Sequence, residues 1–370
     1  MNNKPIIFFV CTGLGRIKRG YESFTRECFE AIKCNSEFTI FLIKGAGENK
    51  DRELKVRNIH RNGKLAYLIS KVSGLDSYTI EQFTFFLNLI FKIVKYKPSV
   101  IYYSDFELGT YLWHFNKWIK YKFKLLFSNG APNSPPFTRM HHVQQLLPKY
   151  YYDAILANVP SSFQTLLPYG INIDVKKNLE KIAEKEKIKQ RLKIPEKKKI
   201  LITVGAINAS HKRMDYVIEE FKKIENKEEY YLILLGQTTN ETPHIFESAS
   251  SLPENLYSIK EVDVSEVGNF LAIADYFILA SLNEGLPRVL PEALSYGLLP
   301  IVHDYEISKQ VLDKFGVFVN MRETGILNSA IDQVSVSVFS KTEIINFAFG
   351  RYSWDVLTDK YINMLHNLAK

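Results

Sequence analysis

The chain is poor in cysteine and contains no long apolar run. Its 370 residues include three cysteines, Cys11, Cys28 and Cys34. An odd number confined to the N-terminal end argues against a disulfide framework and favours a reducing compartment. The longest apolar stretch, from Phe83 to Val94, is interrupted by an asparagine and a lysine and is too short to span a bilayer. The sequence therefore predicts a cytoplasmic protein rather than a secreted or membrane-spanning one.

The sequence also lacks the patterns of metal sites and of common nucleic-acid modules. No Asp-x-Asp motif occurs, and the eight histidines and three cysteines do not cluster with carboxylates at metal-ligand spacing. No nucleic-acid-binding pattern is present either. We therefore expect no metal, no cofactor and no nucleic-acid partner.

Negative charge is scarce in the first half of the chain. The net charge is +8. Residues 1–170 hold 23 Lys and Arg and 12 Asp and Glu, and residues 171–370 hold 25 Lys and Arg and 28 Asp and Glu. The first half therefore carries +11 and the second half −3. This asymmetry favours an anionic partner for the first half, such as a phospholipid surface, a lipid-phosphate acceptor or a phosphorylated substrate. The alternative is that the lysines only keep an aromatic-rich domain soluble.

Short apolar runs alternate with helical patterns along the whole chain, which is typical of parallel sheets with crossover helices. The chain is also too long for one ordinary core. We therefore expect an α/β fold with one domain over 1–170, a second over 171–352 and a C-terminal helix over 353–370. The predicted strands are 6–10, 38–43, 100–103, 124–128, 154–157, 199–204, 230–235, 256–259, 276–279 and 299–302. The predicted helices are 21–33, 81–95, 176–191, 214–223, 264–272 and 288–295.

The segment from Ser281 to Ala293 is the most informative part of the sequence. It follows a predicted strand and passes through Gly285 and Pro287 into a predicted helix. The unpaired N–H groups and positive dipole end at such a helix start suit a phosphate. Glu284 and Glu292 can then face one crevice at the carboxyl end of the sheet. Alternatively, Glu284 is only a helix-start acid and Glu292 a solvent-facing helix residue.

A family resemblance rests on this segment. The pattern Ser-x-x-Glu-Gly-Leu-Pro-x-Val-x-x-Glu-Ala-x-x-x-Gly-x-x-Pro, which starts at Ser281, closely resembles the signature of glycosyltransferase family 4. Other segments that resemble the family in order are 167–172, 204–205 with Lys212, 234–236, 274–281 and 352–354. The resemblance implies the GT-B fold, in which two Rossmann-like domains face a central cleft and a C-terminal helix crosses back to the first domain.

The resemblance also implies roles for individual residues. Lys212 would neutralise the diphosphate of the donor, Glu284 would hold hydroxyls of the donor sugar, and Glu292 would bind the ribose. An arginine of the family is replaced by Ala206, for which neighbouring cations of the same loop can compensate. The expected catalytic residues are Glu284, Lys212 and Asp105. The expected donor-binding residues are Gly13, Gly15, Gly205, His211, Arg213, Gly236, Gly285, Leu286, Pro287, Arg288, Val289 and Glu292.

The first domain offers candidates for acceptor or membrane contact. Asp105 follows a predicted strand and is expected to bind or deprotonate the acceptor hydroxyl, unless it caps the next helix. Trp113 and Trp118 suit a membrane-surface patch, although a helix that packs its aromatic residues onto the sheet explains them as well. A donor-contacting histidine of many relatives has no clear counterpart, since Asn129 follows the fourth strand and His141 and His142 cannot be placed. The acceptor or membrane residues are thus expected to be Arg16, Lys18, Arg19, Asn129, Trp113 and Trp118.

Together these features predict a retaining, metal-independent glycosyltransferase that uses a nucleotide-diphosphate sugar. Its acceptor would be a hydroxyl of a glycan or lipid-linked molecule in cell-surface polysaccharide or glycolipid synthesis, at the inner face of the membrane. The same architecture also carries sugar-nucleotide epimerases and phosphorylases. A third alternative is a degenerate transferase that acts as a binding or scaffold partner, which Ala206 and the missing histidine favour.

Overall fold

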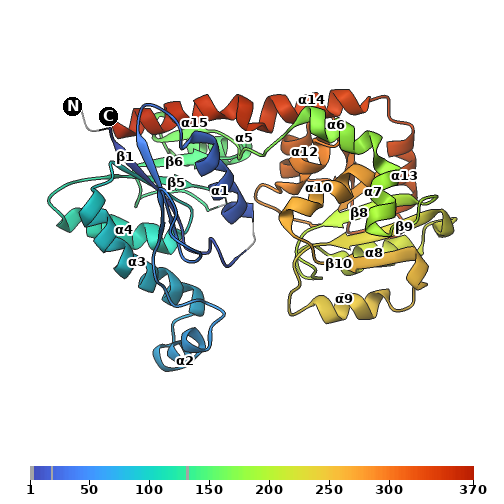
Figure 1. Ribbon diagram of the computed structural model, residues 1–370, viewed down its shortest axis with the longest axis horizontal. Coiled ribbons are helices and arrows are strands. Elements are labelled where there is room, and N and C mark those ends of the chain that lie inside the picture. The colour runs from blue at the N-terminus through green and yellow to red at the C-terminus, as the bar shows by residue number, and fades with distance from the viewer. Residues whose placement is uncertain (1–3, 18–19, 131–132) are drawn as a thin grey trace. The chain divides into compact units, whose positions relative to one another are not determined.

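The protein consists of two compact α/β units. The computed structural model describes residues 4–17, 20–130 and 133–370 (Figure 1). One unit comprises Met1–Gly170 with Trp354–Lys370, and the other comprises Ile171–Ser353. Within the described ranges, no helix has both the length and the apolar character needed to cross a bilayer.

The first unit is built on a seven-stranded parallel sheet. Its strand order is β3-β2-β1-β4-β5-β6-β7, so the order reverses between β1 and β4. Phe8 pairs in register with Phe41 of β2 and with Ile101 of β4. The strands are β1 (Ile6–Cys11), β2 (Thr39–Lys44), β3 (Glu53–Lys55), β4 (Val100–Tyr103), β5 (Lys124–Ser128), β6 (His142–Gln145) and β7 (Gln164–Leu166).

Helices cover both faces of this sheet because alternate strand residues point to opposite sides. Phe8 and Ile101 pack against α3 and α4, whereas Tyr102 packs against Phe24 of α1 (Figure 1). The first unit contains α1 (Gly20–Ile32), α2 (Lys64–Ser73), α3 (Ser77–Tyr96), α4 (Phe106–Trp118), α5 (Pro148–Leu156), the 3-10 turn η1 (Ser161–Phe163) and α15 (Trp354–Ala369).

The C-terminal helix α15 completes the core of the first unit. The ring centroids of Trp354 and Tyr361 each lie 6.0 Å from that of Phe24. The Tyr361 hydroxyl accepts a hydrogen bond from Gln144 Nε2 at 2.7 Å and donates one to the Pro168 carbonyl at 2.8 Å. The last residues of the chain are therefore part of the same hydrophobic layer as α1.

The second unit repeats the architecture with a six-stranded parallel sheet. Its order is β10-β9-β8-β11-β12-β13, which reverses between β8 and β11. The strands are β8 (Lys199–Val204), β9 (Tyr230–Leu235), β10 (Tyr257–Lys260), β11 (Tyr276–Leu279), β12 (Pro300–His303) and β13 (Val317–Val319). The helices are α6 (Val175–Ala183), α7 (Lys185–Leu192), α8 (Met214–Lys222), α9 (Thr242–Ala249), α10 (Val264–Ile273), α11 (Val289–Leu294), α12 (Glu306–Leu312), α13 (Leu327–Ser335) and α14 (Lys341–Tyr352), with the 3-10 turns η2 (Lys227–Glu229) and η3 (Glu254–Leu256).

The α/β prediction is confirmed, and one predicted strand is wrong. Residues 154–157 form the end of α5, which Pro148 starts, and the strands at this edge are β6 and β7. The strand β6 reads His-Val-Gln-Gln, so no apolar run marks it, yet its side chains are buried. Its polar groups are satisfied by partners such as the Tyr102 hydroxyl, which donates to Gln144 Oε1. The predicted helix 176–191 is two helices, α6 and α7.

Candidate active site

The second unit places the predicted glutamate loop beside a glycine turn. Gly205 follows β8, and the loop that carries Glu284 follows β11, the neighbouring strand at the point where the strand order reverses. In open α/β sheets, ligands bind outside the carboxyl ends of the strands at such a point. The geometry therefore brings two of the predicted segments together at the carboxyl end of this sheet.

Lys212 and Glu284 form an ion pair between these two loops. Lys212 Nζ donates to Glu284 Oε1, and the two side chains are only 13% and 9% exposed. His211 Nε2 lies 3.5 Å from the other carboxylate oxygen of Glu284, and its side chain is half exposed. Three predicted site residues thus meet, and the burial of Lys212 and Glu284 reduces solvent screening of their interaction with a ligand.

The loop that carries His211 and Lys212 is held by two side chains that the sequence analysis did not single out. Asn208 Oδ1 accepts a hydrogen bond from the Lys212 backbone N–H at 2.8 Å. Glu241 accepts from the Ser210 backbone N–H at 2.8 Å and from the Ser210 hydroxyl at 2.6 Å. These bonds to the ionised form lower the pKa of Glu241. An asparagine four residues before a site lysine, which suggests a side-chain-stabilised turn, is the only signal in the sequence.

Two predicted glycines are required by close packing in the second unit. A Cβ on Gly205 would lie 2.8 Å from Cε of Lys212, so the lysine side chain lies directly over this glycine. A Cβ on Gly236 would lie 1.5 Å from the Gly205 carbonyl oxygen, and Gly236 has a φ of 156°. Gly236 therefore lets the turn after β9 approach the turn after β8.

Arg213 makes contacts with neighbouring main-chain and aromatic groups. Its Nη1 donates to the Met321 carbonyl at 2.7 Å and to the Ala280 carbonyl at 3.3 Å. The guanidinium also lies 4.3 Å from the ring centroid of Tyr216. Arg213 Nη1 is thus engaged by two main-chain carbonyls, and His211 is the second cationic candidate beside Lys212.

The predicted phosphate-binding helix is short. It forms α11 (Val289–Leu294), with Arg288 at its N-cap position and 7% exposed. Pro287 is buried, whereas Gly285, Leu286 and Glu292 are half-buried. Burial raises the pKa of Tyr296 to about 12, and the negative charge of Glu292 is the second cause of this shift. The predicted donor residues Gly285 to Val289 therefore connect Glu284 to the start of α11, and Glu292 lies within this helix.

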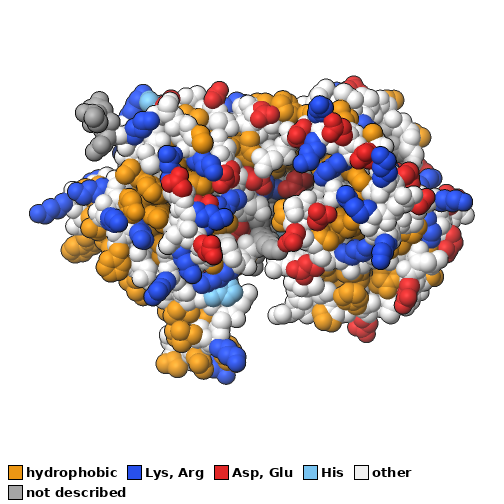
Figure 2. Space-filling model, in the orientation of Figure 1, with side chains coloured by type: hydrophobic (Ala, Val, Ile, Leu, Met, Phe, Trp, Pro, Cys, Tyr) orange, Lys and Arg blue, Asp and Glu red, His pale blue; other side chains and the backbone are white. Residues whose placement is uncertain are grey.

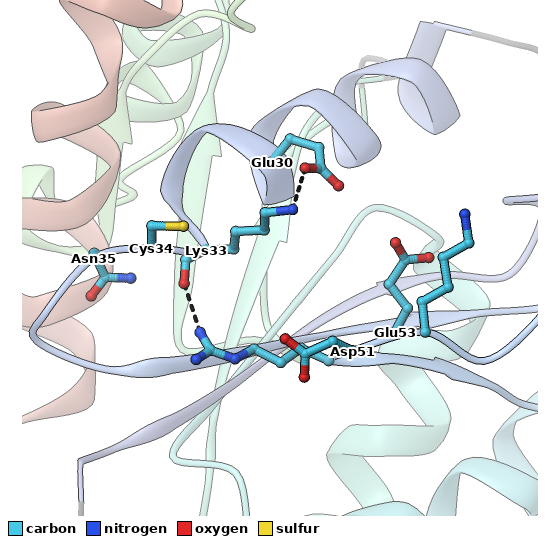
Figure 3. Close-up of a pocket in the computed structure, with 8 residues that line it drawn as sticks. Glu30, Lys33, Cys34, Asn35, Asp51 and Glu53 are labelled. Carbon is cyan, nitrogen blue, oxygen red and sulfur yellow. Dashed lines mark hydrogen bonds and ion pairs between the residues drawn. The ribbon is translucent and has the colours of Figure 1, made fainter.

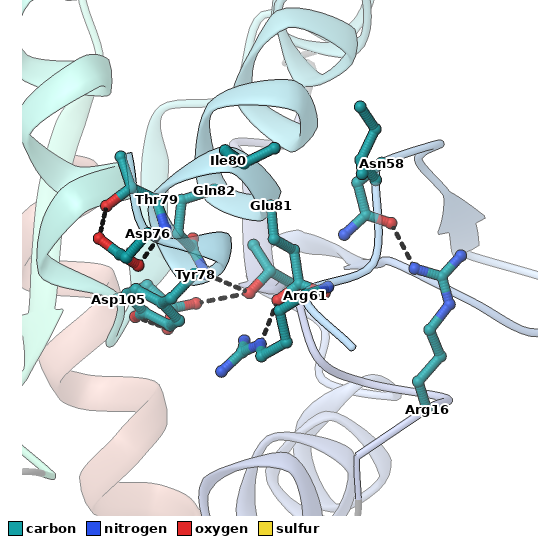
Figure 4. Close-up of polar contacts among 12 residues, drawn as sticks. Arg16, Asn58, Arg61, Asp76, Tyr78, Thr79, Ile80, Glu81, Gln82 and Asp105 are labelled. Carbon is teal, nitrogen blue, oxygen red and sulfur yellow. Dashed lines mark hydrogen bonds and ion pairs between the residues drawn. The ribbon is translucent and has the colours of Figure 1, made fainter. Parts of the chain in front are cut away.

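The first unit assembles a polar network at its own point of strand-order reversal. Thr12 follows β1 and Asp105 follows β4. Asp105 Oδ2 accepts from the Thr12 hydroxyl at 2.9 Å, and Oδ1 accepts from the Tyr78 hydroxyl at 2.6 Å (Figure 4). Asp105 occupies the N-cap position of α4 without a side-chain capping bond, so the capping alternative is wrong. Its carboxylate is instead held at the carboxyl edge of the sheet.

Side chains of α3 and of the loop before α2 surround this network. Gln82 Nε2 donates to the Thr12 hydroxyl at 2.8 Å. Arg61 Nε donates to Glu81 Oε2 at 2.5 Å, and its guanidinium lies 4.5 Å from the ring centroid of Tyr78 (Figure 4). No motif marks Tyr78, Gln82 or Arg61 in the sequence, and only the fold brings them to Asp105.

The glycine turn after β1 packs against its own unit. A Cβ on Gly13 would lie 2.4 Å from Glu22 Oε1, and a Cβ on Gly15, which has a φ of 92°, would lie 2.7 Å from the Ala46 carbonyl oxygen. Arg16 Nη1 donates to Asn58 Oδ1 at 2.8 Å (Figure 4). Lys18 and Arg19, which were predicted to meet an acceptor or a membrane, lie outside the described residues.

The remaining polar candidates of the first unit are engaged within it. Asn129 is buried, and its Nδ2 donates to Gln145 Oε1 at 2.9 Å. His141 Nδ1 accepts from the Leu125 backbone N–H at 3.0 Å. His142 lies on β6, 2.8 Å from the Thr165 hydroxyl, and burial lowers its pKa to about 4. Both histidines therefore contribute to the structure of the sheet edge.

The two tryptophans of the predicted membrane patch differ. Trp113 packs on the core beneath α4, with its ring centroid 5.1 Å from that of His141, as the packing alternative predicts. Trp118 ends α4 and is 87% exposed. Half of the predicted patch is therefore used for packing.

A separate cavity of 610 Å³ lies in the first unit (Figure 3). Two of its basic side chains have local partners, since Lys33 Nζ lies 2.5 Å from Glu30 Oε2 and Arg52 Nη1 donates to the Lys33 carbonyl at 2.8 Å. No predicted site residue lines it. Across residues 4–17, 20–130 and 133–370, no group of three or more His, Cys, Asp and Glu side chains is arranged to hold a metal ion.

The sequence matches a known family model, and the fold is similar to solved structures. Residues 184–334 match the family model described as "Glycosyl transferases group 1". The structure is similar to sucrose-phosphate synthase of Thermosynechococcus elongatus, with 14% identity, a TM-score of 0.77 and 99% of each chain covered. A glycosyltransferase of Rickettsia africae ESF-5 is 16% identical with a TM-score of 0.73, over 100% of this chain and 99% of that one. Anabaena Alr3699/HepE in complex with UDP-glucose is 12% identical with a TM-score of 0.74, over 98% of this chain and 99% of that one. None of the curated proteins matches the sequence.

Proposed function

We propose that this chain of the GT-B fold is a retaining glycosyltransferase, a proposal supported by the match of residues 184–334 to the family model of glycosyl transferases group 1 and by the similar solved structures. It moves a hexose or a related sugar from a nucleotide-diphosphate sugar to a hydroxyl of a glycan or lipid-linked acceptor. The product belongs to a cell-surface polysaccharide or a glycolipid, made on the cytoplasmic side of the membrane. No tightly held metal or cofactor is required.

The observation that carries this proposal is the Lys212–Glu284 pair at the strand-order reversal of the second sheet. When a donor enters, its diphosphate replaces Glu284 as the anionic partner of Lys212. The flexible ammonium group of a lysine is well suited to bind a phosphate. Glu284, released from the lysine, accepts hydrogen bonds from hydroxyls of the sugar. His211, 3.5 Å from Glu284, adds a second cationic group when it is protonated. Because one neighbour is described in complex with UDP-glucose, UDP-sugars are the first donors to test.

The acceptor hydroxyl is assigned to Asp105. The Thr12 and Tyr78 hydroxyls hold its two carboxylate oxygens, so the side chain has a fixed direction at the edge of the first sheet. A carboxylate in such a position can orient a sugar hydroxyl and take its proton as the new bond forms. In a retaining transfer the acceptor approaches on the face from which the diphosphate departs.

Nucleotide binding and product analysis test the proposal. A ligand at one hundred times its dissociation constant raises the free energy of unfolding by about 2.7 kcal/mol, which a thermal-shift panel of nucleoside diphosphates and nucleotide sugars detects. With a sugar acceptor, proton NMR of the product reports the anomeric configuration, and inversion would contradict the retaining assignment. Unchanged rates after chelator treatment are expected, and a rate that depends on added Mg²⁺ would contradict metal independence.

A second candidate is a degenerate transferase that binds without catalysis. It is favoured by Ala206 together with the engagement of Arg213 by main-chain carbonyls, which leaves fewer cations for a diphosphate. A protein that melts cooperatively and shifts with no nucleotide would support this alternative.

A further inference from the structure

The helix α2 (Lys64–Ser73) exposes nearly all of its apolar side chains. Of its residues only Ala66 is buried, while Leu65, Leu68 and Val72 are 55%, 59% and 91% exposed. Helices of this length are marginal in water and normally depend on burying an apolar face. The apolar face of α2 therefore lacks the cover that comparable helices receive.

The outward face of α3 (Ser77–Tyr96) continues this apolar surface. Its buried residues recur at helical spacing and pack on the sheet, whereas Phe83, Leu87, Phe91 and Val94 form a second stripe at spacings of four, four and three. All four of these residues are substantially exposed, Phe91 by 72%. The helices α2 and α3 contact each other, so the two exposed faces belong to one region of the first unit. Figure 2 shows hydrophobic side chains gathered over α2 with basic side chains beside them.

The charges around this surface are mostly positive. Lys64 and Lys71 lie on α2, and Lys71 Nζ stands 4.6 Å from the ring centroid of Tyr67. The end of α3 adds three more lysines, Lys92, Lys95 and Lys97. Of the two acids between residues 64 and 97, Glu81 is fully buried against Arg61, and both carboxylate oxygens of Asp76 accept hydrogen bonds from Thr79. An apolar helix face flanked by lysines is the pattern of a helix that lies in a membrane interface.

We propose that the α2–α3 surface (Leu65, Leu68, Val72, Phe83, Leu87 and Phe91 with the five lysines) docks the protein on an anionic lipid bilayer. The apolar side chains enter the boundary of the acyl region, and the lysines contact anionic headgroups. A second copy of this chain is a poorer occupant, because a two-fold contact would bring this basic surface against itself. Docking does not depend on which sugar the enzyme transfers.

The α2–α3 surface is connected to Asp105 through helix α3. Helix α3 carries the exposed stripe and also Tyr78, whose hydroxyl donates to Asp105. A bilayer on the α2–α3 surface therefore lies next to the helix that orients the acceptor carboxylate. This further step rests on the proposed function, whereas the docking itself does not.

Flotation of the full-length protein with vesicles tests the docking. Wild-type protein should float with phosphatidylcholine vesicles that contain about one third phosphatidylglycerol and much less with phosphatidylcholine alone. The double variant Leu68→Glu/Val72→Glu places two carboxylates on the exposed face of α2, and we expect its vesicle partitioning to fall at least about tenfold. The matched control Val336→Glu/Val338→Glu changes two valines of the second unit that are 78% and 90% exposed, and it should partition like the wild type.

Three results would overturn the proposal. The first is wild-type protein that does not float with anionic vesicles. The second is equal partitioning of the α2 variant and the control. The third is a wild-type dimer in sedimentation velocity that the α2 variant cannot form, which would assign the surface to a second copy. Cooperative melting of both variants shows that they are folded, and nucleotide binding should be the same in all three proteins, so a failed docking test is distinguishable from a failed proposed function.

Discussion

Lys212 and Glu284 should have opposite effects on the affinity for a nucleoside diphosphate. The two side chains neutralise each other, so a diphosphate competes with Glu284 for the lysine. Lys212→Met removes the cation and should weaken binding. Glu284→Gln removes the competing carboxylate and should strengthen binding of the diphosphate, although sugar transfer should be lost because an amide accepts sugar hydroxyls less well.

The magnitudes follow from the burial of the pair. A hydrogen bond to a charged group contributes about 1.5–3 kcal/mol, so Lys212→Met should raise the dissociation constant about 10- to 150-fold. His211 remains near the site and keeps the loss toward the lower end of this range. The gain for Glu284→Gln should be about 1 kcal/mol, or about fivefold, because the new amide still accepts a hydrogen bond from the lysine.

Isothermal titration with the diphosphate that gives the largest thermal shift measures these changes. Lys199→Met is the matched control, because Lys199 begins β8 at the opposite edge of the sheet, is 52% exposed and has its own partner Glu229 at 3.7 Å. Its affinity should equal that of the wild type. Wild-type affinity in Lys212→Met, or equal weakening in both site variants, would refute the assignment of the lysine to the diphosphate.

Three further predictions concern single residues. Tyr78→Phe removes the 2.6 Å hydrogen bond to Asp105, so the KM for the acceptor should rise about tenfold while diphosphate affinity is unchanged; an unchanged KM would separate Asp105 from the acceptor. Gly236→Ala places a Cβ on a backbone oxygen and should lower the free energy of unfolding in urea by more than about 2 kcal/mol, whereas Gly350→Ala, with open space around its Cβ, should not destabilise the protein. Burial holds the pKa of His142 at about 4, below its unfolded value of about 6.5, so the unfolded chain binds the extra proton and stability should fall from pH 6.5 to 4. His142→Gln should lose less stability over this range in urea unfolding, and an identical pH dependence would contradict the assignment.

The sequence predicts best where burial and residue pattern coincide. Strand 276–279, and strand 199–204 beyond its exposed first residue Lys199, are mostly apolar, buried and correctly bounded, because parallel strands covered on both faces are rich in apolar residues. The strand β6 could not be recognised in this way, because three of its four buried residues are polar. Gln144, for example, is hydrogen-bonded to the distant Leu167 carbonyl. Hydrogen-bond partners far apart in the chain leave no local pattern.

The same distinction applies to the site. The family resemblance was enough to predict that Lys212 and Glu284, which are 72 residues apart, both bind the donor, and in the structure their side chains form an ion pair. The supporting residue Glu241 and the Tyr78 hydroxyl belong to no motif, and their roles depend on loop geometry that only the structure shows. Arg213 illustrates the opposite case, in which charge and position suggested a ligand contact but two carbonyls take the side chain.

The contribution of α15 to the first unit has a consequence for the order in which the chain can fold. Residues 171–353 are continuous, so the second unit has all its residues as soon as they leave the ribosome. The first unit lacks Trp354 and Tyr361 until the second unit has been synthesised, and both rings pack on Phe24. Although domains usually fold in order from the N-terminus, the unit that begins first here completes its core only after all residues of the second unit have been made. Until then Phe24 of α1 can pack on Tyr102 and Tyr169 but lacks the two rings of α15.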